Sequence, residues 1–223
     1  MNNYSLIPDI DWVFDKIGVT NKHCVEFGVY NFHDEHTSKI IKQDGWTATY
    51  IECDENQYQQ IVFNCIGYPV TVVKRFITAE NINDVFTEGQ VPKEFDLLSI
   101  DVDGMDYWLW KALDYKPRVV FIEYNGVKTP GTLAVPPYNP DYIWNHTRYM
   151  GSSLDSITKL ANEKGYELYG VDRWGATAFY ILKEEFPKLG IEDNSVEKIF
   201  VHANYGVEAD GGHPGPDGEY LEI

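Results

Sequence analysis

Short apolar segments rich in β-branched and aromatic residues recur along the chain and alternate with segments of helical apolar spacing. The strand-like segments are 24–27, 47–52, 70–73, 95–100 and 118–123. The helix-like segments between them are 34–43, 55–66, 80–88 and 104–113. Strands that are apolar at consecutive positions are typical of a sheet covered on both faces. Because each parallel crossover needs a helix, the alternation predicts a doubly wound, mostly parallel α/β sheet.

The pattern changes after residue 151. A helix is expected over 152–164, with Ser152 or Ser153 as its N-cap and Asp155 in its first turn. Two strands, 166–172 and 176–182, follow with only three residues between them, which is too short for a crossover helix. We therefore predict that these two strands form an antiparallel C-terminal hairpin.

The remaining segments predict the domain organisation. Residues 1–20 are expected to form an N-terminal helical extension, residues 21–184 the main domain, and residues 185–223 a C-terminal extension of loop-like composition. Residues 126–151 contain four prolines and no apolar periodicity. A loop of this length inside a compact domain is usually functional, so it is predicted to be a lid over a substrate, with a contact in a homo-oligomer as the alternative.

Composition excludes several classes of partner. The chain of 223 residues has 18 Lys and Arg against 35 Asp and Glu, a formal net charge of −17, which would repel nucleic acid. No apolar run approaches a membrane span, and the first residues do not read as an export signal, so we expect a cytoplasmic protein without membrane contact. Cys24, Cys53 and Cys65 lack metal-site spacing and are interpreted as reduced core thiols.

Two acidic strand ends suggest a nucleoside site. Ligands of open parallel sheets bind beyond the carboxyl ends of the strands, where Gly28 allows a tight turn and Glu52 could accept hydrogen bonds from a ribose. The first loop has no second glycine, which disfavours a pyrophosphate. The acids Glu26, Asp34 and Glu35 suit an amino group or a sulfonium instead. S-adenosylmethionine has both charges and a ribose.

These motifs carry a family resemblance over about residues 22–183. The segments 25–28, 50–52, 97–104 and 119–123, followed by the hairpin, resemble the ordered motifs of class I S-adenosylmethionine-dependent methyltransferases, and more loosely their FkbM-like branch. The resemblance implies a Rossmann-like methyltransferase fold of seven strands with the last one antiparallel. It also implies a cofactor site whose residues are Glu26 and Gly28 at the methionine part, Glu52 at the ribose, Thr78, Ala79 and Glu80 near the adenine, and Asp101.

A second group of acids follows the fourth and fifth predicted strands. Asp101, Asp103, Glu123 and Asn125 could together hold Mg²⁺ through oxygen ligands, which is similar to metal-dependent O-methyltransferases of the catechol type. In the alternative, Asp101 or Asp103 acts as a general base while neighbouring acids cap the following helix. His146 is a further candidate base, with His33 and His36 in reserve.

The sequence therefore predicts a methyltransferase that uses S-adenosylmethionine and acts on a hydroxyl of a small molecule, with a Mg²⁺ site or a general base as the two alternatives at the acceptor. Two other interpretations stay open. One is a Mg²⁺-dependent phosphatase of the haloacid-dehalogenase type with Asp101 as nucleophile, and the other is a non-catalytic nucleotide-sensing module.

Overall fold

The computed structural model describes residues 10–33, 36–43 and 45–223. The first nine residues of the predicted N-terminal helix lie outside these ranges. The chain divides into two compact units, each with its own buried residues. Unit 1 comprises residues 1–18, 103–107 and 121–223, and unit 2 comprises residues 19–102 and 108–120.

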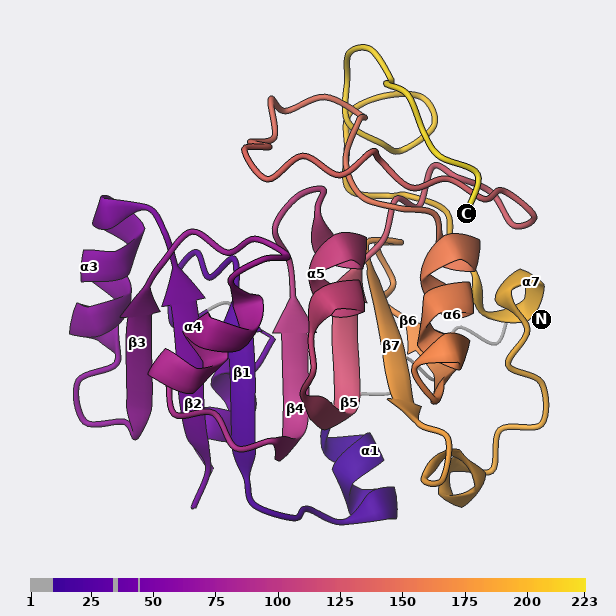
Figure 1. Ribbon diagram of the computed structural model, residues 1–223. Helices are drawn as coiled ribbons and strands as arrows, with labels where there is room; N and C mark the ends of the chain where they lie inside the picture. Colours follow the sequence, from indigo (N-terminus) through magenta and orange to yellow (C-terminus); the bar gives the residue numbers. More distant parts are fainter. Residues whose placement is uncertain (1–9, 34–35, 44) are drawn as a thin grey trace. The chain divides into compact units, whose positions relative to one another are not determined.

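Seven strands form one sheet in the order β3-β2-β1-β4-β5-β7-β6 (Figure 1). They are β1 (His23–Phe27), β2 (Thr47–Glu52), β3 (Val70–Lys74), β4 (Glu94–Ile100), β5 (Lys116–Glu123), β6 (Tyr166–Val171) and β7 (Thr177–Leu182). Strand β1 pairs in parallel with β2 and β4, and β2 pairs in parallel with β3. Strands β6 and β7 pair with each other in antiparallel orientation. The predicted fold class is confirmed, including the C-terminal hairpin.

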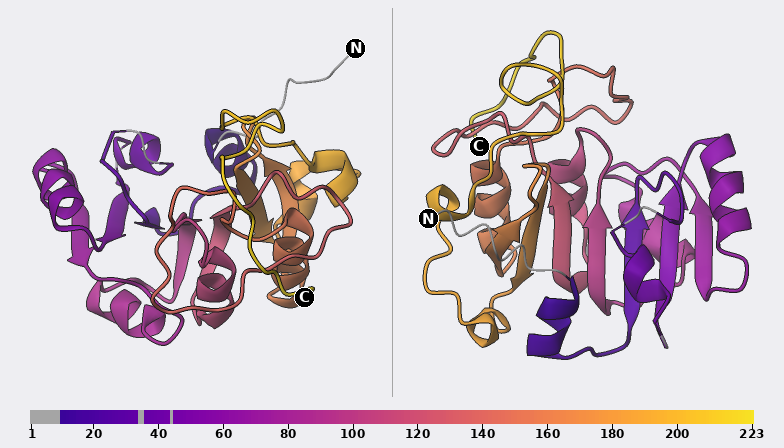
Figure 2. Two further views of the ribbon diagram at one scale, coloured as in Figure 1. Left: turned by 90° about the horizontal axis from the view of Figure 1, so that it is seen from above. Right: turned by 180° about the vertical axis from the view of Figure 1, so that it is seen from behind.

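Unit 2 is wound around β1. The chain runs outward from β1 to β2 and β3, then returns to place β4 on the other side of β1, so the strand order reverses between β1 and β4. Helix α4 (Ile82–Glu88) covers one face of this part of the sheet and α2 (Ser38–Ile41) the other (Figure 2), while α3 (Glu55–Asn64) connects β2 to β3. A reversal of this kind leaves the carboxyl ends of β1 and β4 facing a crevice, the usual ligand site of doubly wound folds.

The core of unit 2 is aromatic. The ring of Phe86 on α4 lies 4.9 Å from that of Tyr115 and 6.2 Å from that of Phe27, measured between centroids. Because a large buried ring contributes a few kcal/mol by leaving water, this packing holds α4 firmly against the sheet. Helix α3 begins at Asp54, whose carboxylate accepts hydrogen bonds from the backbone N–H groups of Asn56 and Gln57.

Helix α2 is shorter than predicted. The expected helix over 34–43 is reduced to Ser38–Ile41, and residues 34–35 lie outside the described part. The carboxylate of Glu26 accepts hydrogen bonds from the N–H groups of His36 and Thr37, so these amides are bound to β1 rather than to a preceding helical turn. A tertiary contact of this kind cannot be read from apolar spacing.

Unit 1 contains the hairpin and the helices around it. Helix α6 (Leu154–Glu163) begins at its predicted N-cap Ser153, whose hydroxyl accepts from the N–H of Ser156, and packs on β6. Helix α1 (Ile10–Ile17) contacts the short helix η1 (Phe186–Leu189). One further short helix is α7 (Val196–Ile199). Helix α5 (Asp106–Ala112) and strand β5 contribute residues to both units.

The chain after residue 200 is packed onto the loop 126–151, and we call these two segments together the cap (Figure 1). Val135 and Leu221 form an antiparallel bridge through two backbone hydrogen bonds. Arg148 forms an ion pair with Asp210 at 3.0 Å. The segment with loop-like composition therefore has a defined path, although glycine and proline prevent a regular helix or strand.

Two smaller expectations can be compared with the structure. In the described part of the chain, no helix has the length and apolar character needed to cross a bilayer. Cys24 and Cys65 are buried free thiols as predicted, but the interpretation of Cys53 as a core residue is wrong, since it is exposed. The reason is its position directly after Glu52, where the chain leaves β2 for α3.

Candidate functional site

Three predicted cofactor residues of unit 2 come level at the carboxyl ends of neighbouring strands. Phe27 of β1 pairs with Ile51 of β2 and with Ile100 of β4. The next residue of each strand is Gly28, Glu52 and Asp101, respectively. Parallel strands keep their register, so these three positions lie side by side at the point where the strand order reverses.

Gly28 permits a close backbone approach that no other residue would allow. Its φ is +78°, and a Cβ atom at this position would lie 1.5 Å from the carbonyl oxygen of Asp101. The Asp101 N–H donates to the carbonyl of Phe27 at 3.3 Å, which extends the pairing of β1 and β4 into the loops. The glycine therefore lets the first loop rest on the end of β4 without a side chain in the crevice.

Glu52 is a buried carboxylate at the end of β2, only 6% exposed. Its Oε1 accepts hydrogen bonds from the N–H groups of Cys53 at 2.7 Å and Asp54 at 2.6 Å. Burial raises the pKa of Glu52, and these hydrogen bonds oppose the increase. Both amides share one oxygen, so neither of them occupies Oε2.

Glu26 has a different environment, although it too is buried at 2% exposure. Its two oxygens accept from the N–H groups of His36 and Thr37, each at 3.1 Å, and from the Thr37 hydroxyl at 2.6 Å. That hydroxyl also lies 2.8 Å from the Tyr50 hydroxyl. Glu26 thus anchors the start of α2, and its predicted contact with the methionine part of a cofactor stays a prediction. The neighbouring acids Asp34 and Glu35 lie outside the described residues.

The predicted adenine-side residues Thr78, Ala79 and Glu80 form the turn that leads into α4. The Thr78 N–H donates to Asn81 Oδ1 at 2.8 Å, and the Asn81 side-chain amide donates to the carbonyl of Phe76 at 2.9 Å. Thr78 and Ala79 are half-buried and Glu80 is exposed. This turn follows β3 at the same end of the strands as Glu52.

In unit 1, Asp103 and Glu123 bring two carboxylates together, with oxygen atoms within 4.8 Å of each other. Asp103 has a φ of +56°, a conformation that costs a non-glycine residue about 1–3 kcal/mol and is common at functional sites. Burial raises the pKa of Asp103, while the charges of His213 and His146 act in the opposite direction. Glu123 is the buried last residue of β5. Asp101, two residues before Asp103 in the chain, belongs to unit 2.

Asn125, the fourth predicted metal ligand, fixes the loop that follows it. Its side-chain amide donates to the carbonyls of Arg148 at 3.1 Å and Met150 at 2.8 Å, and its Oδ1 accepts from the N–H of Val127 at 3.2 Å. These bonds join the two ends of the loop 126–151. The side-chain oxygen thus already accepts one hydrogen bond within the loop.

The predicted base His146 lies in the cap together with a histidine that sequence reasoning missed. The Trp144 ring is 4.7 Å from the His146 ring and 4.6 Å from the His213 ring, centroid to centroid. His146 is exposed and has a φ of +63°. His213 comes from the glycine- and proline-rich terminal segment, where no periodicity pointed to it. The reserve base His36 contacts the Ser99 hydroxyl at 2.9 Å in unit 2.

No protein-family model matches the chain, and no curated protein matches it either. Among solved structures, it is similar to a putative caffeoyl-CoA O-methyltransferase from Staphylococcus aureus, with 18% identity over 78% of this chain and 80% of that chain and a TM-score of 0.49. The SAH-bound methyltransferase PaMTH1 from Podospora anserina has 14% identity over 73% and 72%, with a TM-score of 0.47. A putative S-adenosylmethionine-dependent methyltransferase from Listeria monocytogenes has 9% identity over 78% and 96%, with a TM-score of 0.48. These are likenesses of fold.

Proposed function

We propose that the chain is an S-adenosylmethionine-dependent methyltransferase that binds its cofactor in unit 2, at the carboxyl ends of β1, β2 and β4. The observation that carries the proposal is that Gly28, Glu52 and Asp101 follow paired residues of three neighbouring strands and so lie side by side where the strand order reverses. A doubly wound sheet binds its ligands at this position.

The chemistry of the row favours a nucleoside without phosphate. Glu52 accepts hydrogen bonds, and a carboxylate at the end of the second strand is suited to the two hydroxyls of a ribose. The acids Glu52 and Asp101 beside Gly28 would repel a pyrophosphate. The same two acids would attract a ligand that carries a sulfonium and an amino group. Asp101 is proposed as part of the same cofactor site, with Thr78, Ala79 and Glu80 on its adenine side.

The cofactor proposal is tested by calorimetric titration of the whole chain with S-adenosylhomocysteine. Glu52→Gln keeps an oxygen that can accept from Cys53 and Asp54 but removes the charge, so affinity should fall about 10- to 100-fold. Glu94→Gln is the matched control, because Glu94 begins β4 at the opposite end of the strands. The proposal would be rejected if S-adenosylhomocysteine did not bind the wild-type chain, or if both variants lost the same affinity for it.

For the acceptor we propose a hydroxyl of a small molecule. Its proton would be removed by Asp103 or His146 of unit 1 or by Asp101, with Mg²⁺ lowering the pKa of the hydroxyl when bound. The carboxylates of Asp103 and Glu123 fit a hard cation, since their oxygens lie within 4.8 Å of each other. Asp101 is the third proposed ligand, and Asn125 fits less well because its oxygen already accepts a hydrogen bond.

The metal is tested with Mn²⁺ as a probe in place of Mg²⁺. Electron paramagnetic resonance of free Mn²⁺ should show binding by the wild-type chain and a loss of about tenfold or more in Asp103→Asn. Hydrolysis of p-nitrophenyl phosphate that depends on Mg²⁺ and is lost in Asp101→Asn would instead support the phosphatase interpretation.

A further inference from the structure

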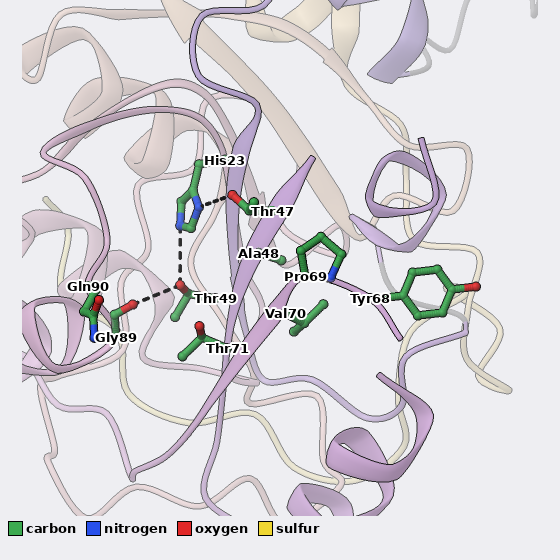
Figure 3. A pocket seen from close by; sticks show the side chains of 10 residues that line it. All are labelled: His23, Thr47, Ala48, Thr49, Tyr68, Pro69, Val70, Thr71, Gly89 and Gln90. Atoms are coloured by element: carbon green, nitrogen blue, oxygen red, sulfur yellow. Dashed lines mark hydrogen bonds between the residues drawn. The ribbon is translucent and has the colours of Figure 1, made fainter. Parts of the chain in front are cut away.

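A hollow of about 410 Å³ lies at the opposite end of the strands of unit 2 from the proposed cofactor site (Figure 3). It is bordered by the first residues of β1, β2 and β3 and by the turn after α4. Its volume is within the range of small-ligand pockets, about 300–1,000 Å³. Neither the predicted motifs nor the proposed methyl transfer uses this hollow.

The lining of the hollow carries no acid, lysine or arginine among its ten residues. This is unexpected for a chain with a net charge of −17. Threonine hydroxyls, the His23 imidazole and the Gln90 amide supply the polar atoms, and Ala48, Pro69 and Val70 supply apolar surface. An uncharged wall does not compensate a charged ligand for its lost hydration, so the ligand that suits it is uncharged.

The imidazole of His23 is held in the wall between two threonine hydroxyls. The Thr49 hydroxyl donates its proton to the carbonyl of Gly89 at 3.3 Å, so it can only accept from His23 Nε2, which lies 3.4 Å away. His23 Nδ1 lies 2.8 Å from the Thr47 hydroxyl, which also lies 3.5 Å from the carbonyl of Lys22. Figure 3 shows this chain of hydrogen bonds across one side of the hollow.

Two other polar groups of the lining have no partner. Thr71 and Gln90 are both exposed, and within the described ranges of the chain neither the Thr71 hydroxyl nor the Gln90 side-chain amide makes a hydrogen bond to another residue. Both groups can donate and accept. They therefore remain available to a ligand, whereas His23 and Thr49 mainly bond each other.

The turn that carries Gln90 is held in a strained conformation. Gln90 has a φ of +55°, which is unfavourable for a side chain of this type. A Cβ at the preceding Gly89 would lie 2.7 Å from Thr49 Cγ2, so only glycine lets the turn approach β2 this closely. Strain of this kind persists where the surroundings fix it, and it is concentrated at functional sites.

We propose that the hollow binds a small uncharged molecule with several hydroxyl groups, of the sugar or polyol class. Sugar hydroxyls both donate and accept, which matches Thr71 and Gln90, and the C–H faces of a sugar ring match the apolar atoms of Pro69 and Val70. The site is independent of the proposed cofactor site, because it lies at the other end of the same strands.

The test uses ¹⁵N-labelled whole chain and records backbone amide shifts during titration. The neutral probes are the methyl glycosides of glucose, galactose and mannose, and myo-inositol. The charged probes of similar size are glucuronate and glucose 6-phosphate. At least one neutral probe should give saturable shifts at Thr71 and Gln90 at up to about 100 mM, and the charged probes should give none.

Two variants that keep the fold assign the effect to the hollow. Thr71→Val preserves the β-branched shape, and Gln90→Gly suits the positive φ, so each should weaken binding about tenfold without loss of folding. Thr129→Val makes the same chemical change in unit 1 and should have no effect. The proposal is overturned if no neutral probe binds saturably, if charged probes bind equally well, or if the variants bind like the wild type. Titration of the same samples with S-adenosylhomocysteine reports on the cofactor proposal separately.

Discussion

Acidification should weaken the fold of unit 2 through His23. Burial lowers the pKa of this imidazole from 6.5 to about 4, with the charge of Asp96 opposing the shift. Because the folded pKa lies below the unfolded value, the unfolded chain binds more protons between about pH 6.5 and pH 4. The free energy of unfolding must then fall as the pH falls through this window.

The magnitude follows from the two pKa values of His23. At about pH 5, nearly every unfolded molecule carries a proton on His23, whereas only about one folded molecule in ten does. This difference corresponds to about 2 kcal/mol relative to pH 7. Since the ring is only partly buried, solvent screening reduces the expected value to about 1 kcal/mol.

The measurement is urea unfolding followed by tryptophan fluorescence at pH 7 and pH 5, for the wild type and His23→Gln. Other groups with shifted pKa values, such as Glu52 and Asp103, contribute to both proteins and cancel in the comparison. The wild type should therefore lose about 1 kcal/mol more than the variant on acidification. A titration of the His23 ring by NMR gives the folded pKa directly. The reasoning would be refuted if acidification lowered the free energy of unfolding equally in the two proteins, or if the His23 ring titrated near pH 6.5.

Three further substitutions test other parts of the structure. Asp96→Asn should lower the free energy of unfolding, measured by urea titration, by about 3–5 kcal/mol, and a loss below about 1 kcal/mol would contradict this. The reason is that Asp96 is fully buried, accepts hydrogen bonds from three backbone amides and pairs with Arg118 at 2.8 Å. Gly28→Ala should abolish calorimetric binding of S-adenosylhomocysteine and destabilise unit 2, since its Cβ would overlap the carbonyl of Asp101; retained affinity would argue against the close approach. Asn125→Ala removes two donors from the loop 126–151 and should speed amide hydrogen exchange in that loop about tenfold or more, with unchanged exchange counting against its clamping role.

The sheet could be predicted because its signal is local. Strands β1, β2, β4 and β5 are buried on both faces and appear in the sequence as short apolar runs, whereas β3 at the edge of the sheet is partly exposed and is marked mainly by its β-branched residues. All seven predicted strands are present. The hairpin followed from the three residues that separate its strands, since no helix fits there. The start of α2 could not be predicted in this way, because it is fixed by side-chain hydrogen bonds from the amides of His36 and Thr37 to Glu26 of β1, which leave no trace in the apolar spacing.

The cap could be predicted only as a long loop. Its hydrogen bonds join residues far apart in the chain, such as Val135 with Leu221 and Arg148 with Pro214, and no periodicity in either segment predicts them. His213 was missed for the same reason, although its ring contacts those of Trp144 and Tyr205. The neighbours of a histidine in a glycine-rich segment are set by tertiary packing, so they cannot be predicted from the sequence around it.

Three buried acids of unit 2 show why residue type alone does not identify a binding carboxylate. Asp96 lies between three amides and an arginine, so its charge is compensated within the protein. Glu26 has donors on both of its oxygens. Glu52 differs because Cys53 and Asp54 both bond Oε1, and because burial raises its pKa despite those bonds. A carboxylate that is less fully compensated gains more from two added hydroxyl donors, which is the physical reason that the ribose contact is proposed for Glu52 rather than for Glu26 or Asp96.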